Sequence, residues 1–207
     1  MLFMIRLLRF IGKLLGRWKL FRKLKEDFKG VRFIWGKYWA MYGGSSALFS
    51  STYFYIALAL TIVNFGAWYH SGWWDIVIAS VPTILGFTLA GLAVFLGMDS
   101  GFSRFLAGAE ENKISPFMTL VSAFAHFIIT QAVAVIVALT VKSASFYVEG
   151  MPSLYYEVVF VMNRVAWFVG YFIYMYSMVQ VFSAVFAIFR ATSWFEMYAG
   201  QDKNKDK

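Results

Sequence analysis

Long runs of apolar residues, interrupted by single charges, dominate the pattern along this chain. No Asp, Glu, Lys or Arg occurs in four stretches, which are residues 38–74, 76–98, 114–141 and 165–189. About 20 apolar residues in a helix, rising about 1.5 Å per residue, cross the ~30 Å hydrocarbon core of a bilayer. The pattern therefore predicts an all-α, polytopic membrane protein with four transmembrane helices.

Turn and boundary residues place the predicted spans within these stretches. The spans cover about residues 47–68, 76–98, 117–141 and 158–189. Ser115–Pro116 predicts the start of the third span, because serine caps helices and proline suits the first helical turn. Pro82 predicts a kink or a loosened turn in the second span. The fourth span is longer than a bilayer requires, so we expect it to tilt or to continue beyond the lipid.

The N-terminal 42 residues differ from the rest, because they combine apolar residues with many basic ones. Eleven of the 19 Lys and Arg residues precede residue 38, against two acidic residues there. Apolar side chains recur at helical spacing on one face, and the opposite face carries Arg6, Arg9, Lys13 and Arg17. We predict a basic amphipathic helix that lies on the membrane and contacts anionic lipids or a partner, without direct nucleic-acid binding.

Three regions follow from this pattern: an interfacial arm (residues 1–42), a four-helix transmembrane domain (43–190) and a polar tail (191–207). The connection between the first two spans carries no Lys or Arg, whereas the arm, the 99–116 connection and the tail do. By the positive-inside rule, both termini and the 99–116 connection are cytoplasmic. We expect a multi-pass membrane protein with this topology.

Composition supports the membrane interpretation and narrows the chemistry. Hydrophobic residues make up 60% of the chain and charged residues 14%, with a mean hydropathy of +0.64. Cysteine is absent, which excludes disulfides and thiolate chemistry. The sequence holds no HExxH, no Gly-rich phosphate loop and no Gly-x-Ser-x-Gly. We therefore expect no enzyme, no catalytic residue, no metal and no cofactor.

Polar residues inside the predicted spans are candidate functional groups, because they are costly in lipid. The candidates for lining a pore or the bundle interior are Asn64, His126, Gln131 and Gln180. His126 is either a proton-responsive group or a neutral histidine that hydrogen-bonds between helices. Arg164 is either functional or a side chain that reaches the headgroups.

Small residues in the second span form a candidate packing seam. They are Gly86, Ala90, Gly91 and Gly97. Small side chains at helical spacing let a neighbouring helix approach closely, either within one bundle or across a homo-oligomer. The sequence alone leaves both alternatives open.

Three segments carry a resemblance to a known class of proteins. They are LGFTLAGLAVFL (residues 85–96), SPF (115–117) and HFIITQ (126–131). In these segments the chain resembles small four-span bacterial membrane proteins of phage-defence loci, such as the membrane effectors paired with retrons and the membrane subunit of the Kiwa system. The resemblance implies a membrane protein that a partner controls.

Two function hypotheses follow. The first is a non-enzymatic inner-membrane effector or sensor of antiviral defence, controlled by a cytosolic protein or ribonucleoprotein, that perturbs the membrane or signals. The alternative is a constitutive oligomeric ion channel or small transporter with a polar path. A structural membrane scaffold is a third possibility.

Overall fold

The fold is given by a computed structural model that describes residues 23, 26, 28–98, 100–108, 114–146 and 148–205. The chain divides into two compact units, residues 1–40 and 41–207. In the first unit, residues 28–40 are helical. The basic residues of the predicted arm, from Arg6 to Arg17, lie outside the described residues. The second unit holds helices α2 to α8, and the described residues of both units contain no strand.

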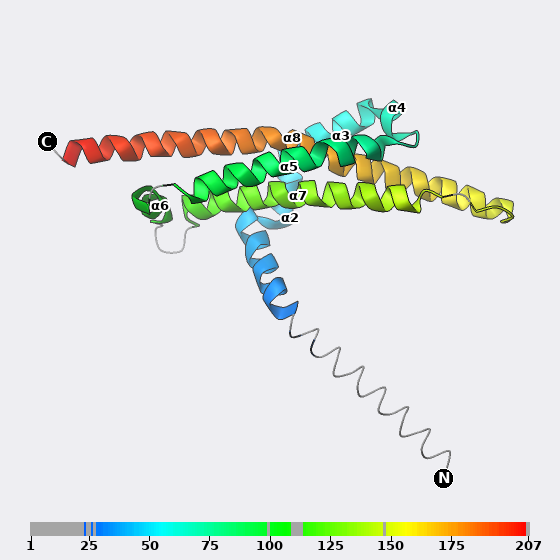
Figure 1. Cartoon of the computed structure of the whole chain (residues 1–207), viewed down its shortest axis with the longest axis horizontal. Coiled ribbons are helices and arrows are strands. Elements are labelled where there is room, and N and C mark those ends of the chain that lie inside the picture. Colours follow the sequence, from blue (N-terminus) through cyan, green and yellow to red (C-terminus); the bar gives the residue numbers. More distant parts are fainter. Residues whose placement is uncertain are drawn as a thin grey trace, which may run out of the picture. The chain divides into compact units, whose positions relative to one another are not determined.

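Three long helices dominate the second unit: α5 (Trp73–Leu96), α7 (Pro116–Ala144) and α8 (Ser153–Lys205) (Figure 1). Each is long and apolar enough to cross a membrane. Only 17–33% of the residues in their most apolar windows are buried within the chain, so most apolar side chains face outward. Such an apolar outer surface is typical of a protein whose solvent is lipid. The chain is thus all-helical and has the features of a membrane protein.

The ends of these helices follow from local sequence. Ser115 caps α7, with its Oγ accepting a hydrogen bond from the Met118 backbone N–H at 3.2 Å, and Pro116 occupies the first turn. The predicted Ser115–Pro116 start is therefore confirmed. Gly72 precedes α5 with φ 106°, a left-handed conformation that glycine adopts without steric cost. α5 continues as one helix through Pro82.

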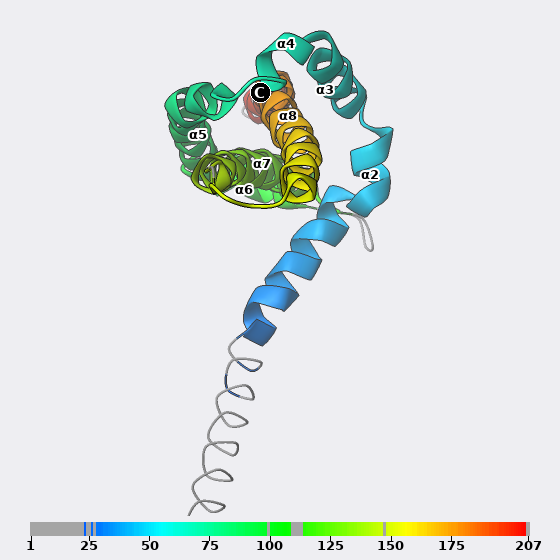
Figure 2. The same ribbon diagram turned by 90° about the vertical axis from the view of Figure 1, so that its right-hand side faces the viewer.

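The long helices pack as antiparallel neighbours. α7 contacts both α5 and α8, and α3 (Thr52–Val63) packs on α8 on the side away from α5 (Figure 2). The antiparallel order is visible at the connections, since Asp75 in the first turn of α5 pairs with Lys142 in the last turn of α7. Successive helices therefore run in alternating directions, as the predicted topology requires.

The segment predicted as the first span, residues 47–68, is divided into three helices. α2 (Gly44–Ser50) and α3 meet at a 54° bend, and α4 (Phe65–Trp68) follows α3. Ser51 breaks the helix with an extended backbone, φ −71° and ψ 125°. At Asn64 the side-chain Nδ2 donates to the Leu60 carbonyl at 2.8 Å. Asparagine competes in this way with regular helical hydrogen bonding, and neither this contact nor the extended backbone at Ser51 is visible in an apolarity pattern.

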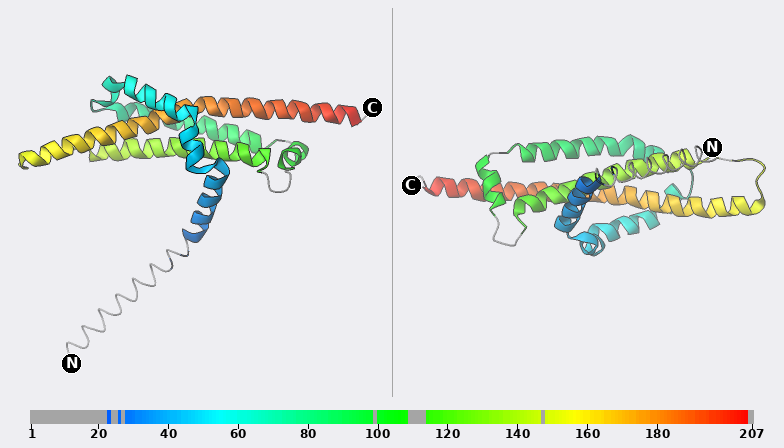
Figure 3. Two further views of the ribbon diagram at one scale, coloured as in Figure 1. Left: turned by 180° about the vertical axis from the view of Figure 1, so that it is seen from behind. Right: turned by 90° about the horizontal axis from the view of Figure 1, so that it is seen from below.

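The last helix, α8, is longer than any predicted span. Its 53 residues form one unbroken helix, about 80 Å long at 1.5 Å per residue. Figure 3 shows α8 running past both ends of α5 and α7. The helix that contains the predicted fourth span (residues 158–189) therefore extends beyond it at both ends.

Two apolar clusters lie at opposite ends of the bundle. The tryptophan end is built around the start of α5; its buried residues are Trp73, Trp74, Val77, Val81, Ala134, Ala138, Trp167, Tyr171 and Tyr174. The α6 end includes α6 (Ser100–Ala107); its buried residues are Phe95, Phe102, Leu106, Leu120, Phe124, Ala187 and Ala191. Buried polar residues occupy the stretch of each long helix between these two ends.

Candidate functional site in the middle of the helix bundle

A layer of buried polar side chains lies between the two apolar clusters. We call it the polar layer, and its members are Thr88, His126, Thr130, Gln131, Ser177 and Gln180. They come from α5, α7 and α8, so the layer joins all three long helices. A buried polar group that lacks a hydrogen-bond partner inside the protein is costly, most of all in lipid.

Gln131 is the most deeply buried member, with 0% of its surface exposed. Its Oε1 lies 3.5 Å from the Thr88 hydroxyl of α5, and that hydroxyl lies only 2.8 Å from the Ile84 carbonyl. A threonine hydroxyl has a single proton to donate, so the shorter contact takes most of it. The Gln131 Nε2 has no hydrogen-bond partner among the residues that the structure describes. The Gln131 amide is therefore held weakly.

Gln180 on α8 also has an unpaired amide atom, and in this residue it is the acceptor rather than the donor. It is 4% exposed, and within the described part of the chain its Oε1 lacks a hydrogen-bond partner. A buried amide group without a partner costs about 1–3 kcal/mol. The two glutamines thus leave one donor and one acceptor unpaired in the interior of the bundle.

His126 belongs to a second group of polar contacts. Its Nε2 lies 3.1 Å from the Tyr176 hydroxyl of α8, and the Tyr42 ring stacks on it with a centroid distance of 3.7 Å. A side-chain hydrogen bond also joins Tyr42 and Tyr176. Burial raises the pKa of the Tyr42 hydroxyl, so Tyr42 remains a neutral phenol. These contacts tie α7 and α8 to the chain that precedes α2, and the one between His126 and Tyr176 is a hydrogen bond between α7 and α8.

The structure therefore buries three of the four predicted polar residues. His126, Gln131 and Gln180 are buried in the middle of the long helices. Asn64 lies apart, at the end of α3, and its amide bonds the carbonyl of its own helix. It has no place in the polar layer.

Arg164 lies at the tryptophan end and is held there by several contacts. Its guanidinium donates to the Tyr69 carbonyl. Its Cζ lies 4.1 Å from the centre of the Tyr69 ring and 4.6 Å from the rings of Phe160 and Trp167. Cation–π contacts of this kind stabilise a partly desolvated arginine. Through these contacts Arg164, which belongs to α8, holds the connection that precedes α5 against α8.

The predicted small-residue seam is not packed within the chain. Gly86, Ala90 and Gly97 are exposed, and Gly91 is half-buried. A Cβ added at Gly86 or Gly91 would meet nothing within 4 Å. The face of α5 that carries Gly86, Ala90 and Gly97 therefore remains available to lipid or to another copy, whereas Gly91 lines a pocket between α5 and α8.

The glycine that does allow a close approach is Gly170, which the sequence interpretation missed. A Cβ there would lie 2.5 Å from the Trp73 Cη2, because the indole rests directly on the α8 backbone. Gly170 is the sole glycine in the predicted fourth span, among many bulky side chains. A single glycine among bulky side chains was the feature of the sequence that could have indicated this close approach.

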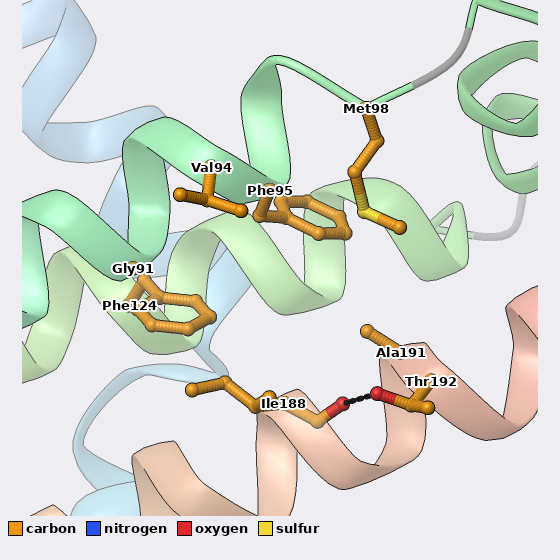
Figure 4. A pocket seen from close by; sticks show the side chains of 8 residues that line it. All are labelled: Gly91, Val94, Phe95, Met98, Phe124, Ile188, Ala191 and Thr192. Atoms are coloured by element: carbon orange, nitrogen blue, oxygen red, sulfur yellow. Dashed lines mark hydrogen bonds between the residues drawn. The ribbon is translucent and has the colours of Figure 1, made fainter.

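A pocket of 290 Å³ opens at the α6 end. Its lining residues are Gly91, Val94, Phe95, Met98, Phe124, Ile188, Ala191 and Thr192. Figure 4 shows α8 side chains facing those of α5 across the gap, with the Thr192 hydroxyl donating to the Ile188 carbonyl at 3.0 Å. The lining is thus almost wholly apolar.

Among the described residues, no three His, Asp or Glu side chains come together as a metal site.

The fold and these contacts define a helical membrane protein with a closed, partly unsatisfied polar layer. No family model, curated protein or solved structure matches the chain. Inference about function therefore depends on the site itself. Its groups can offer hydrogen bonds to water, an ion or another helix when the long helices separate.

Proposed function

We propose that this chain is a non-enzymatic effector or sensor of an anti-phage defence system in the bacterial inner membrane. In this proposal a cytosolic protein or ribonucleoprotein controls it, and its activation perturbs the membrane or sends a signal. The defence setting comes from the resemblance carried by residues 85–131. The polar layer gives the physical reason why a partner would be able to control the activity of the protein.

The proposed topology has four crossings. Three are α5, α7 and α8, and the bent pair α2–α3 provides the fourth, since together the two helices are long and apolar enough. The alternation of basic connections places both termini in the cytoplasm. The arm with Arg6, Arg9, Lys13 and Arg17 would then face anionic lipid and the cytosolic partner.

The observation that carries the proposal is the pair of buried glutamines with unpaired polar atoms. In the closed bundle Gln131 Nε2 and Gln180 Oε1 have no partner. Separation of the helices would let water reach both groups and restore their hydrogen bonds, which lowers the free-energy cost of opening. A partner that binds the open form more tightly would shift the population toward it. Self-association through the unpacked face of α5 would extend such an opening into a pore.

The test follows membrane potential during phage challenge, with and without the genomic neighbours of the gene. We expect depolarisation only when phage and the neighbours are both present. Gln131→Leu removes the amide at similar volume, so it should leave folding stability unchanged or raise it by about 1 kcal/mol. The same change should reduce the open population about tenfold, because the open state loses a hydrogen bond to water worth ~1.4 kcal/mol.

Asn64→Leu is the matched control, since it removes an amide that lies outside the polar layer. It should depolarise like the unmodified protein. Depolarisation by Gln131→Leu at the normal rate would show that the layer has no part in the activity. Unchanged potential and unchanged phage sensitivity in every strain would refute the effector proposal.

A constitutive oligomeric channel or small transporter is the second candidate, favoured by the same polar layer. Purified protein in liposomes separates the two. Flux of ions or solutes without any partner would support the channel and contradict controlled action. Tight liposomes that leak only after the partner is added would support the effector.

A further inference from the structure

A small pocket between α3, α7 and α8 differs from the apolar one because charge and hydroxyl groups line it. Its volume is 160 Å³, and its residues are Tyr53, Thr119, Leu120, Ala123, Ser183, Phe186, Ala187 and Arg190. At ~30 Å³ per water molecule it holds about five waters. It is thus too small for a typical cofactor of drug size, but large enough for a compact polar group.

The polar groups of this pocket have unused hydrogen-bonding capacity. Among the described residues, no partner bonds the Arg190 guanidinium or the hydroxyls of Tyr53 and Ser183. Thr119 is different, since its hydroxyl donates to the Ser115 carbonyl at 3.1 Å. An arginine with two free hydroxyls nearby offers donors suited to phosphate oxygens.

The pocket lies where a phospholipid headgroup would meet the protein. Arg190 is the first charged residue after the uncharged stretch 165–189, and Thr119 lies in the first turn of α7. Both therefore mark the boundary of the apolar zone at the α6 end. Phe186, Ala187 and Leu120 continue the lining on the apolar side, where an acyl chain would run.

We infer that this pocket binds the phosphate of an anionic phospholipid in the cytoplasmic leaflet. The leaflet assignment rests on the proposed topology. Basic pockets between transmembrane helices on the cytoplasmic side hold anionic headgroups in this manner. The bound lipid joins α3 to α7 and α8, so it stabilises the contact of the broken first span with the long helices.

Binding to the full-length protein in detergent is measured by native mass spectrometry with short-chain phosphatidylglycerol. Phosphatidylcholine and inorganic phosphate serve as comparison probes. We expect phosphatidylglycerol to bind most tightly, because it combines net negative charge with an acyl chain. Arg190→Gln should weaken its binding about tenfold, the factor for one charge-assisted hydrogen bond.

Two further variants make the result specific. Ala123→Leu fills the pocket without changing charge, so it should also weaken phosphatidylglycerol binding. Lys203→Gln removes a positive charge 13 residues further along α8 and should leave binding unchanged. A thermal melt of each variant in detergent verifies that it is folded.

Unchanged binding in both Arg190→Gln and Ala123→Leu would overturn the inference, as would equal loss in Lys203→Gln. Inorganic phosphate that binds as tightly as phosphatidylglycerol would identify a soluble phosphate site and overturn the lipid assignment. None of these measurements depends on phage defence. Failure of the lipid site and failure of the proposed function are therefore distinguishable.

Discussion

The tryptophan end and the α6 end of the bundle are packed in different ways. At the tryptophan end, the Trp73 indole lies on the backbone of Gly170, and Arg164 is enclosed by aromatic rings. At the α6 end, pockets of 290 and 160 Å³ interrupt the helix contacts. Helices are thus closely packed at the tryptophan end, whereas pockets lie between them at the α6 end.

The difference indicates where the bundle can change shape. Close-packed side chains resist displacement, because any movement must displace their neighbours as well. Helices that flank a pocket can approach or part with fewer lost contacts. We therefore expect opening to begin at the α6 end, while the tryptophan end holds the helices together as a hinge.

The largest predicted effect comes from filling the space between Trp73 and α8. Gly170→Leu should destabilise the folded protein by about 3 kcal/mol, since the new side chain must displace a buried indole. The indole has little room to move, because Trp73 also contacts Trp74 and Tyr171 at centroid distances of 6.0 Å. Unfolding in mixed micelles with a rising fraction of SDS, followed by tryptophan fluorescence, measures the change.

Ala191→Leu is the control at the α6 end, because it adds the same side chain to the same helix. Ala191 borders the pocket of 290 Å³, so we expect a stability change within about 1 kcal/mol. Equal destabilisation by the two variants would remove the contrast between the ends.

A smaller effect is predicted for Arg164. Arg164→Ala should destabilise the tryptophan end by about 1–2 kcal/mol, because it removes the hydrogen bond to the Tyr69 carbonyl and the cation–π contacts. Arg164→Lys keeps the charge but loses the planar guanidinium, so it should recover part of the stability. Hydrogen exchange of the backbone amides near Tyr69 measures the loosening. Protection that is unchanged in Arg164→Ala would show that this arginine does not fasten the connection.

The smallest effect is expected from the ion pair between Asp75 and Lys142. Their atoms are 2.7 Å apart, but the side chains are 62% and 53% exposed, so solvent screens the attraction. Asp75→Asn should cost about 0.5 kcal/mol in SDS unfolding at low salt and less at high salt. A loss of several kcal/mol would mean that the tryptophan end depends on charge more than on packing.

The sequence was sufficient to predict the long helices, because long apolar runs without charged residues are typical of membrane-spanning helices. It also identified the start of α7 at Ser115, since capping is a local property. The predicted first span differs from the structure because the backbone is extended at Ser51 and because the Asn64 side chain bonds the Leu60 carbonyl, and a pattern of apolar residues shows neither. Amphipathicity of the arm stays a prediction, since Arg6 to Arg17 lie outside the described residues.

For the candidate site, sequence reasoning found the right residue types but not their neighbours. His126, Gln131 and Gln180 were identifiable because polar groups are rare in apolar spans. His126 contacts Tyr176 on α8, whereas Gln131 makes only a weak contact with Thr88 on α5. Which residue meets which helix depends on the faces that α7 turns toward α5 and α8. That information is tertiary, and the same holds for Gly170, whose importance depends on a tryptophan far away in the chain.

The continuity of α8 has a mechanical consequence. Its 53 residues contain no proline and no break, so a twist applied at one tip turns the whole shaft about its axis. A ligand or partner that binds the final turns would therefore rotate the buried Gln180 side chain roughly 30 Å away, at ~1.5 Å per residue. No loop interrupts α8 between those turns and this residue.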